Sequence, residues 1–287
     1  MRKSAYTIAL LLGLLFSQAA EAQREQVTLH VPNFVRPLVE KWVAEYQKFN
    51  AQVDFQFKSG KSQDNEPNSI LFVTDGSDGV FFARYAVLPV TARQSEAARL
   101  IGSHKLNARK LRSLFFVEDE LDEDEDDDDS QEEQLHIYTG TSQASASHLY
   151  ATHFGEETAD YRGKKISGDD SYLNVAISRD PLGVTVNALS NLFNLESRQL
   201  REELTLLPLD LDKQGRTVLG DGRLDDIIAL LEEQQYSEIP IGKAGLAYDR
   251  SNPLLSDFVH WVLTYGTQYV HEYGLLQLPS QDLAQNF

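Results

Sequence analysis

The sequence predicts an α/β protein in which strands and helices alternate along the chain. Residues 27–31 and 53–57 alternate apolar and polar side chains as strands do, and an amphipathic helical pattern separates them. Apolar runs at 69–74 and 85–90 have the length and composition of buried strands. The chain of 287 residues contains no cysteine, so a hydrophobic core must hold it together without disulfides.

The first β-α-β unit is the clearest local pattern. Its helix is predicted over residues 34–49, with Asn33 as the N-cap. Its apolar positions recur every three to four residues and form one face: Phe34, Leu38, Trp42, Tyr46 and Phe49. Because a strand, a helix and a strand follow one another, we expect the two strands to be parallel.

The later elements follow from the same kinds of pattern. Residues 75–79 are a turn cluster of Asp, Gly and Ser, and Asn107 opens a helix over 108–115. The turn 166–170 ends in an N-cap for a helix over 172–178. Further strands are predicted at 135–138, 184–189, 204–209 and 244–248, and further helices at 95–101, 224–234, 254–265 and 267–273.

The N-terminus has the three parts of a secretory signal peptide. Arg2 and Lys3 are followed by an apolar stretch over 5–16 and by Ala20-Glu21-Ala22, a small-x-small cleavage site. Cleavage after Ala22 would release the mature chain into the periplasm. The alternative is a membrane anchor, but the apolar core is shorter than the ~20 residues that a spanning helix needs.

The net charge of −18 is concentrated in one segment. Thirteen of the 44 acidic side chains lie in residues 118–133, and a run of like charges predicts a disordered, solvated loop. Contact with a partner or loose binding of cations is the alternative role for this loop. The absence of a basic surface argues against nucleic acid as a partner. The absence of cysteine excludes thiolate catalysis and a lipid anchor.

Several stretches, in order, resemble the phosphate-type periplasmic solute-binding proteins of ABC transporters, particularly the divergent branch common in Bacteroidetes. The resemblance covers nearly all of the mature chain. The stretches are Phe34-Val35-Arg36-Pro37-Leu38, RYAVLPV from Arg84, GKKISGDD from Gly163, DPLGVTVN from Asp180 and Trp261-Val262-Leu263-Thr264.

This resemblance implies a type II periplasmic-binding fold, in which two α/β lobes are joined by two crossing strands and ligand binds between them. It implies a signal peptide over 1–22 and a first lobe made of 23–90 plus 245–287. The second lobe would be 91–244 and would carry the acidic insertion 118–133. The second crossing would lie near 239–248.

The resemblance also implies a function. The protein would be a periplasmic monomer that captures phosphate or a related small oxyanion and delivers it to an ABC permease in the inner membrane. It would not be an enzyme, and the chain has no P-loop, dinucleotide or Gly-x-Ser-x-Gly motif. The alternative is an envelope interaction or scaffold protein with a degenerate solute site. It arises because the first turn is Pro-Asn-Phe and the second loop lacks the family's Arg.

The candidate ligand-binding residues lie at strand-to-helix turns, where backbone N–H groups and the helix dipole favour an anion. Helix capping by Asn33, Ser145 or Ser147, and turn formation at 75–79, are the structural alternatives. Asp75 would accept the proton of protonated phosphate and so distinguish it from sulfate. The candidates are Asn33, Phe34, Asp75, Ser77, Thr139, Thr141, Ser142, Ser145 and Ser147.

A damaged calcium loop is the one candidate metal site. Asp210, Asp212, Gln214 and Asp221 stand at alternating or terminal ligand positions around Gly215, but Gln214 replaces the usual Asp or Asn. A weak Ca²⁺ site is therefore the only cofactor expectation, and a vestigial loop is the alternative.

Overall fold

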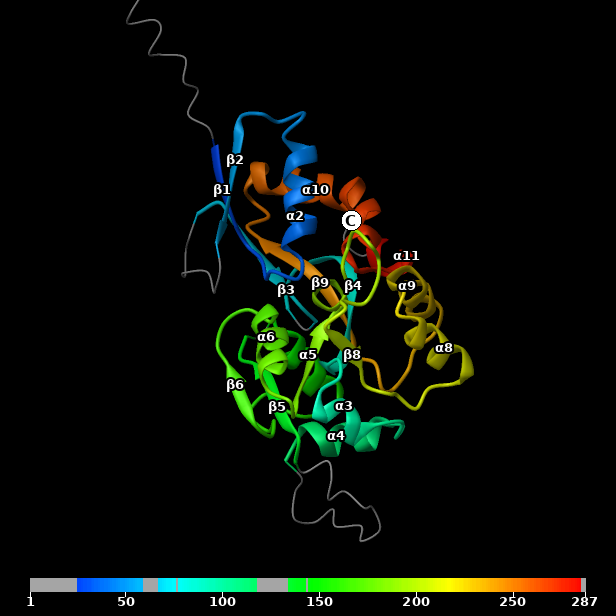
Figure 1. Ribbon diagram of the computed structural model, residues 1–287. Helices are drawn as coiled ribbons and strands as arrows, with labels where there is room; N and C mark the ends of the chain where they lie inside the picture. Colours follow the sequence, from blue (N-terminus) through cyan, green and yellow to red (C-terminus); the bar gives the residue numbers. More distant parts are fainter. Residues whose placement is uncertain (1–24, 59–66, 76, 118–133, 143, 285–287) are drawn as a thin grey trace, which may run out of the picture.

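The computed structural model describes residues 25–58, 67–75, 77–117, 134–142 and 144–284. The predicted signal peptide and acidic insertion lie outside these residues. The protein has a mixed α/β fold, with two bodies of strands and helices through which one continuous sheet runs (Figure 1). The strand order along the sheet is β2-β1-β3-β9-β4-β7-β5-β6, and β8 and β10 also pair with β4. None of the described helices is long and apolar enough to cross a membrane.

Strand β4 (Val80–Ala92) passes from one body to the other. Its first half pairs with β9 (Ile241–Tyr248) as far as Ala86, and its second half pairs with β7 from Val87 onward. The amide of Val87 donates to the carbonyl of Pro240, where the chain returns. We use this change of partner to name lobe 1, residues up to 86 and from 241, and lobe 2, residues 87–240. This definition differs from the boundaries expected from the sequence, after residue 90 and before residue 245, which remain a prediction.

Lobe 1 contains the predicted β-α-β unit. Strand β1 (Glu25–His30) pairs in parallel with both β2 (Val53–Lys58) and β3 (Ser69–Val73), which confirms the expected parallel pair. Helix α2 (Arg36–Tyr46) covers this sheet beside α10 (Pro253–Thr264). The buried ring of Tyr46 contacts that of Phe258 on α10, and the buried ring of Trp42 packs against Phe82 on β4. The lobe is completed by β10 (Leu276–Gln277), the 3₁₀ turns η2 (Gly266–Tyr269) and η3 (His271–Tyr273), and α11 (Ser280–Ala284).

Helix α2 is shorter than predicted. The amides of Val35 and Arg36 both donate to the carbonyl of Pro32, so the chain turns before the helix begins at Arg36. Val35 occupies the N-cap position without a side-chain cap, so the predicted capping role of Asn33 is wrong. Phe49 lies beyond the end of the helix with 80% of its surface exposed, so its predicted place on the apolar face is also wrong.

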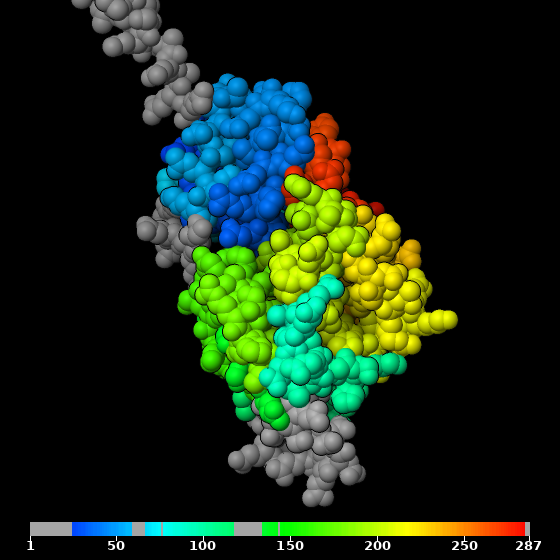
Figure 2. Space-filling view, in the orientation of Figure 1, coloured from blue at the N-terminus to red at the C-terminus, as the bar shows by residue number. Residues whose placement is uncertain are grey.

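Lobe 2 surrounds the second half of β4. Its strands are β5 (His136–Gly140), β6 (Lys164–Ile166), β7 (Gly183–Ala188) and β8 (Leu204–Leu206). Its helices are α3 (Glu96–Ile101), α4 (Ala108–Phe115), α5 (Ala146–His153), α6 (Ser171–Arg179), α7 (Leu189–Leu192), α8 (Lys213–Asp221) and α9 (Leu224–Glu233). On the face drawn in Figure 2, the blue residues of lobe 1 lie directly against the green and yellow-green residues of lobe 2.

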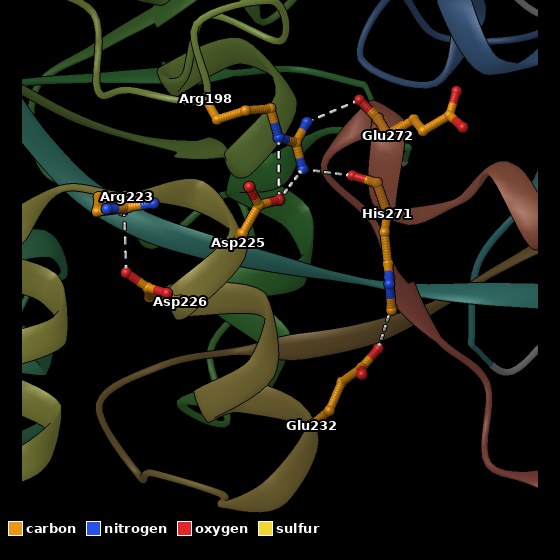
Figure 3. Close-up of polar contacts among 7 residues, drawn as sticks. All are labelled: Arg198, Arg223, Asp225, Asp226, Glu232, His271 and Glu272. Carbon is orange, nitrogen blue, oxygen red and sulfur yellow. Dashed lines mark hydrogen bonds and ion pairs between the residues drawn. The ribbon is translucent and has the colours of Figure 1, made fainter.

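A polar network also ties the C-terminal segment to lobe 2 (Figure 3). The guanidinium of Arg198 donates to the carbonyls of His271 at 2.7 Å and Glu272 at 2.8 Å, and it pairs with Asp225 on α9 at 2.7 Å. The Nε2 atom of His271 lies 2.8 Å from a carboxylate oxygen of Glu232, also on α9. These contacts hold α9 against the C-terminal 3₁₀ turns.

Candidate functional site

Segments from both lobes meet around Tyr85, just before β4 leaves lobe 1. Tyr85 is 2% exposed, and its ring lies against that of Phe34 with centroids 5.0 Å apart. Burial raises the pKa of its phenol, and the charges of Asp75 in lobe 1 and Asp170 in lobe 2 raise it further. Carboxylates from opposite lobes therefore lie near the same buried ring.

Asp169 connects the two lobes at this place. Its Oδ2 accepts a hydrogen bond from the backbone N–H of Asn33 at 3.2 Å, and its Oδ1 accepts one from the N–H of Ser171 at 2.8 Å. Asn33 stands in the turn between β1 and α2 of lobe 1, whereas Asp169 precedes α6 of lobe 2. The Asp169 carboxylate thus accepts the hydrogen bond of a backbone amide that we expected, from the sequence, to donate to an anion.

The neighbouring Asp170 is directed into lobe 2. Its side chain is 6% exposed, and its Oδ2 accepts a hydrogen bond from the N–H of Ala146, the first residue of α5, at 2.6 Å. Burial raises the pKa of this carboxyl to about 7. The Ala146 bond opposes that shift, and the charge of Asp169 adds to it. An anionic oxygen at the start of α5 is stabilised by the unpaired helix amides and the helix dipole.

A buried amide network holds this dipeptide in place. Asn187 on β7 is fully buried, and its Nδ2 donates to the backbone carbonyl of Asp170 at 2.8 Å and to Asn174 on α6 at 3.1 Å. Its Oδ1 accepts the N–H of Ala188 at 2.9 Å and the Nδ2 of Asn191 at 2.8 Å. Asn187 therefore fixes the start of α6 relative to the sheet.

Asp75 lies on the lobe 1 side of the same region. Its Oδ2 accepts a hydrogen bond from the N–H of Lys243 on β9 at 2.7 Å. A Cβ atom placed on the adjacent Gly242 would lie 2.8 Å from Leu149 of α5 and 3.1 Å from the Asp75 carboxylate. Helix α5 of lobe 2 thus packs closely against the returning strand beside Asp75, and a larger residue at position 242 would have to displace the side chain of Leu149.

Two of the hydroxyls predicted to bind a ligand make hydrogen bonds within lobe 2. Ser145 caps α5 by accepting the N–H of His148 at 3.1 Å, which confirms its capping alternative. Ser147 is fully buried and accepts the N–H of Gly140 at 2.8 Å. Thr139 is 1% exposed, and its hydroxyl has no hydrogen-bond partner among the residues that the structure describes.

The remaining predicted residues are distributed between surface and core. Thr141 and Ser77 are exposed, and exposed Ser142 accepts the N–H of Ala144 at 3.2 Å. Phe34 is 3% exposed and packs against Phe72 and Tyr85, so its side chain belongs to the core. Of the predicted set, the structure brings Asn33 and Asp75 near the start of α5, which Ser145 caps.

The predicted calcium loop has a different structure. Asp212 caps α8 by accepting the N–H of Gly215 at 2.7 Å, and Lys213 to Asp221 are helical. Asp212 and Asp221 are therefore about 13 Å apart along the helix, given ~1.5 Å of rise per residue. Within the part of the chain that the structure describes, no group of three or more His, Cys, Asp or Glu side chains gathers to hold a metal. The Asp-x-Asp spacing reflects a helix cap here and not a loop that wraps around an ion.

Sequence reasoning missed the central pair, Asp169 and Asp170. Asp170 does stand at the predicted N-cap position of α6, but its carboxylate makes no cap bond there. It accepts the N–H of Ala146 at the start of α5 instead. The signal in the sequence is that two adjacent carboxylates stand where one cap is sufficient. Neither Tyr85 nor Asn187 carries a comparable local signal, because each lies within a strand that looks like ordinary core.

Comparison with solved structures shows the type II periplasmic-binding fold. A structure described as a phosphate ABC transporter substrate-binding protein with bound phosphate, from Clostridium perfringens, matches with a TM-score of 0.60 and 8% identity. The match covers 89% of this chain and all of that chain (100%). An ABC-type phosphate transport receptor from Vibrio cholerae matches with a TM-score of 0.53 and 10% identity, over 88% of this chain and 100% of that one.

Regulatory domains share the same fold. The OxyR2 regulatory domain from Vibrio vulnificus matches with a TM-score of 0.52 and 10% identity, over 86% of this chain and 97% of that one. No protein-family model and no curated protein matches the sequence. The predicted fold class, two α/β lobes joined by crossing strands, is confirmed, and these similarities concern the fold alone.

Proposed function

We propose that this chain is a solute-binding protein that captures a small solute between its two lobes. The observation that carries the proposal is that one dipeptide, Asp169-Asp170, contacts both predicted binding turns. Asp169 accepts the amide of Asn33 from lobe 1, and Asp170 accepts the amide of Ala146 in lobe 2. The two turns therefore face the same small region between the lobes. Hinge closure of two lobes over a ligand would bring such turns together around it.

The finer proposal is that the solute is phosphate or a related small oxyanion, delivered to an ABC permease from the periplasm. Its support is chemical, because both amides already donate to carboxyl oxygens, and a phosphate oxygen accepts such bonds in the same way. One oxygen of Asp75 accepts the N–H of Lys243, and the second would accept a hydrogen bond from the O–H of a protonated oxyanion. The fold likeness to phosphate-transport proteins is consistent with this choice.

The direct experiment is titration calorimetry of the mature chain with phosphate, sulfate and an uncharged sugar, at pH 7 and fixed ionic strength. We expect heat from an oxyanion and none from the sugar. If no solute in this panel gives heat at millimolar concentration, oxyanion capture is rejected.

The second candidate is an envelope interaction protein whose solute site has been lost. The observation in its favour is that other groups of the protein already bind the donors and hydroxyls expected to bind a solute. Asp169 and Asp170 accept the amides of Asn33 and Ala146. The hydroxyl of Ser145 caps α5, and that of Ser147 accepts the amide of Gly140. The absence of oxyanion binding even after removal of the Asp169 carboxylate would favour this candidate.

A further inference from the structure

We infer that the carboxylate of Asp169 is a tethered anion, which holds the lobes closed at this turn and competes with an oxyanion solute for the amide of Asn33. The competition rests on the proposed function, whereas the closure of the lobes does not. The starting point is that a carboxylate of lobe 2 accepts a hydrogen bond from a backbone amide of lobe 1 at one of the predicted binding turns.

The two carboxylates of the dipeptide differ in what can release them. The bond from Ala146 to Asp170 lies within lobe 2, and Asp170 is 6% exposed, so separation of the lobes leaves it intact. The bond from Asn33 to Asp169 joins different lobes and is exposed, so separation of the lobes breaks it. Asp169 is therefore the exchangeable member of the pair, and Asp170 is a permanent part of the site.

The carboxylate of Asp169 is also held in a position from which it can bind the Asn33 amide again when the lobes close. Its second oxygen accepts the N–H of Ser171, and Asn187 anchors the carbonyl of Asp170 to β7. The carboxylate is thus preorganised at the start of α6, and its attachment to the same chain gives it a high effective concentration near Asn33. A free oxyanion must displace this group before it can bind the same amide.

The test compares Asp169→Ala with a matched control, Asp226→Ala. Asp226 is an exposed lobe 2 aspartate on α9 that pairs with Arg223 of the same lobe (Figure 3), so its loss removes the same charge without removing a described bond between the lobes. Small-angle scattering of the ligand-free mature chain should show a larger radius of gyration for Asp169→Ala than for the wild type or the control. Calorimetry should show phosphate or sulfate binding about tenfold more tightly to Asp169→Ala, with no change in the control.

An unchanged radius of gyration in Asp169→Ala overturns the closure. An unchanged oxyanion affinity, measured in a protein that does bind oxyanions, overturns the competition. If Asp169→Ala expands and neither oxyanion binds to any variant, the closure stands and the proposed oxyanion function fails. Asp169→Asn keeps an oxygen for the Ser171 amide and serves as the second variant if Asp169→Ala does not fold. It should change both readouts in the same direction by a smaller amount.

Discussion

The backbone amide of Asn33 donates to the carboxylate of Asp169 across 136 positions of sequence, at 3.2 Å. This bond places the turn after β1 beside the turn before α6, in different lobes. One residue further on, Asp170 makes the corresponding bond to the start of α5 at 2.6 Å. The pair is therefore the link between two turns that are both expected to donate to an anion.

The buried carboxyl of Asp170 should make the stability of the protein depend on pH. Its pKa is raised from 3.8 to about 7, so the folded state binds a proton that the unfolded state has released between these values. Wild-type stability should therefore fall as the pH rises from about 4 to about 7, by roughly 1–4 kcal/mol. Urea unfolding at pH 4, 6 and 8 measures this change.

Asp170→Asn removes the charge and keeps an oxygen for the Ala146 amide. We expect it to be more stable than the wild type at pH 8 and equal to it near pH 4. Asp226→Asn, which removes an exposed charge, should leave the pH profile unchanged. An Asp170→Asn variant that is less stable than the wild type at pH 8 would contradict the raised pKa.

The network around Asn187 should be sensitive to truncation. Asn187→Ala removes the donor to the Asp170 carbonyl and the acceptor for the Ala188 amide, both of which are buried. Because these groups would lose their partners, we expect a loss of about 2–4 kcal/mol in the free energy of unfolding. Thr141→Ala, an exposed change in the neighbouring loop, should stay within about 0.5 kcal/mol of the wild type. An equally small effect of Asn187→Ala would show that this network does not position the dipeptide.

The two buried hydroxyls of the 139–147 loop should respond in opposite ways. Ser147 accepts the Gly140 amide, so Ser147→Ala leaves a buried donor unpaired and should cost about 1–3 kcal/mol. Within the described part of the chain the Thr139 hydroxyl has no partner, and Thr139→Val replaces this desolvated polar group by a methyl of similar shape. We expect Thr139→Val to be neutral or to stabilise the protein by about 1 kcal/mol. Thermal and urea unfolding of both variants provide the comparison, and destabilisation by Thr139→Val would show that the hydroxyl is bound.

Arg198 should contribute more to stability than the neighbouring Arg223, although both pair with aspartates of α9 (Figure 3). Arg198 donates to two backbone carbonyls of the C-terminal segment and is 20% exposed, whereas Arg223 is 62% exposed and lies 3.3 Å from Asp226. We expect Arg198→Ala to cost about 1–3 kcal/mol and Arg223→Ala less than about 0.5 kcal/mol. Arg198→Lys should recover only part of the loss, because an ammonium lacks the planar fork. Equal costs for the two alanine variants, measured by urea unfolding, would mean that the carbonyl contacts add nothing.

Local chemistry made several elements predictable. The period of the apolar positions indicated α2 and its flanking strands, and the β-α-β order indicated that β1 and β2 are parallel, as they are. Asn107 and Ser145 were recognisable as cap residues, and each accepts the backbone amide three positions later. Such patterns are readable because residues within a few positions of one another interact along one helix or strand.

The site depended on contacts that no local pattern encodes. Local patterns indicated which turns begin helices, and the resemblance to solute-binding proteins implied two α/β lobes. The contacts themselves came from the folded arrangement: Asp169 accepts the amide of Asn33, Asp170 accepts an amide of α5 instead of capping its own helix, and Phe34 joins the core. Strands β4, β7 and β9 place distant turns next to one another and so fix which side chains meet, and the spacing of residues along the chain does not reveal that arrangement.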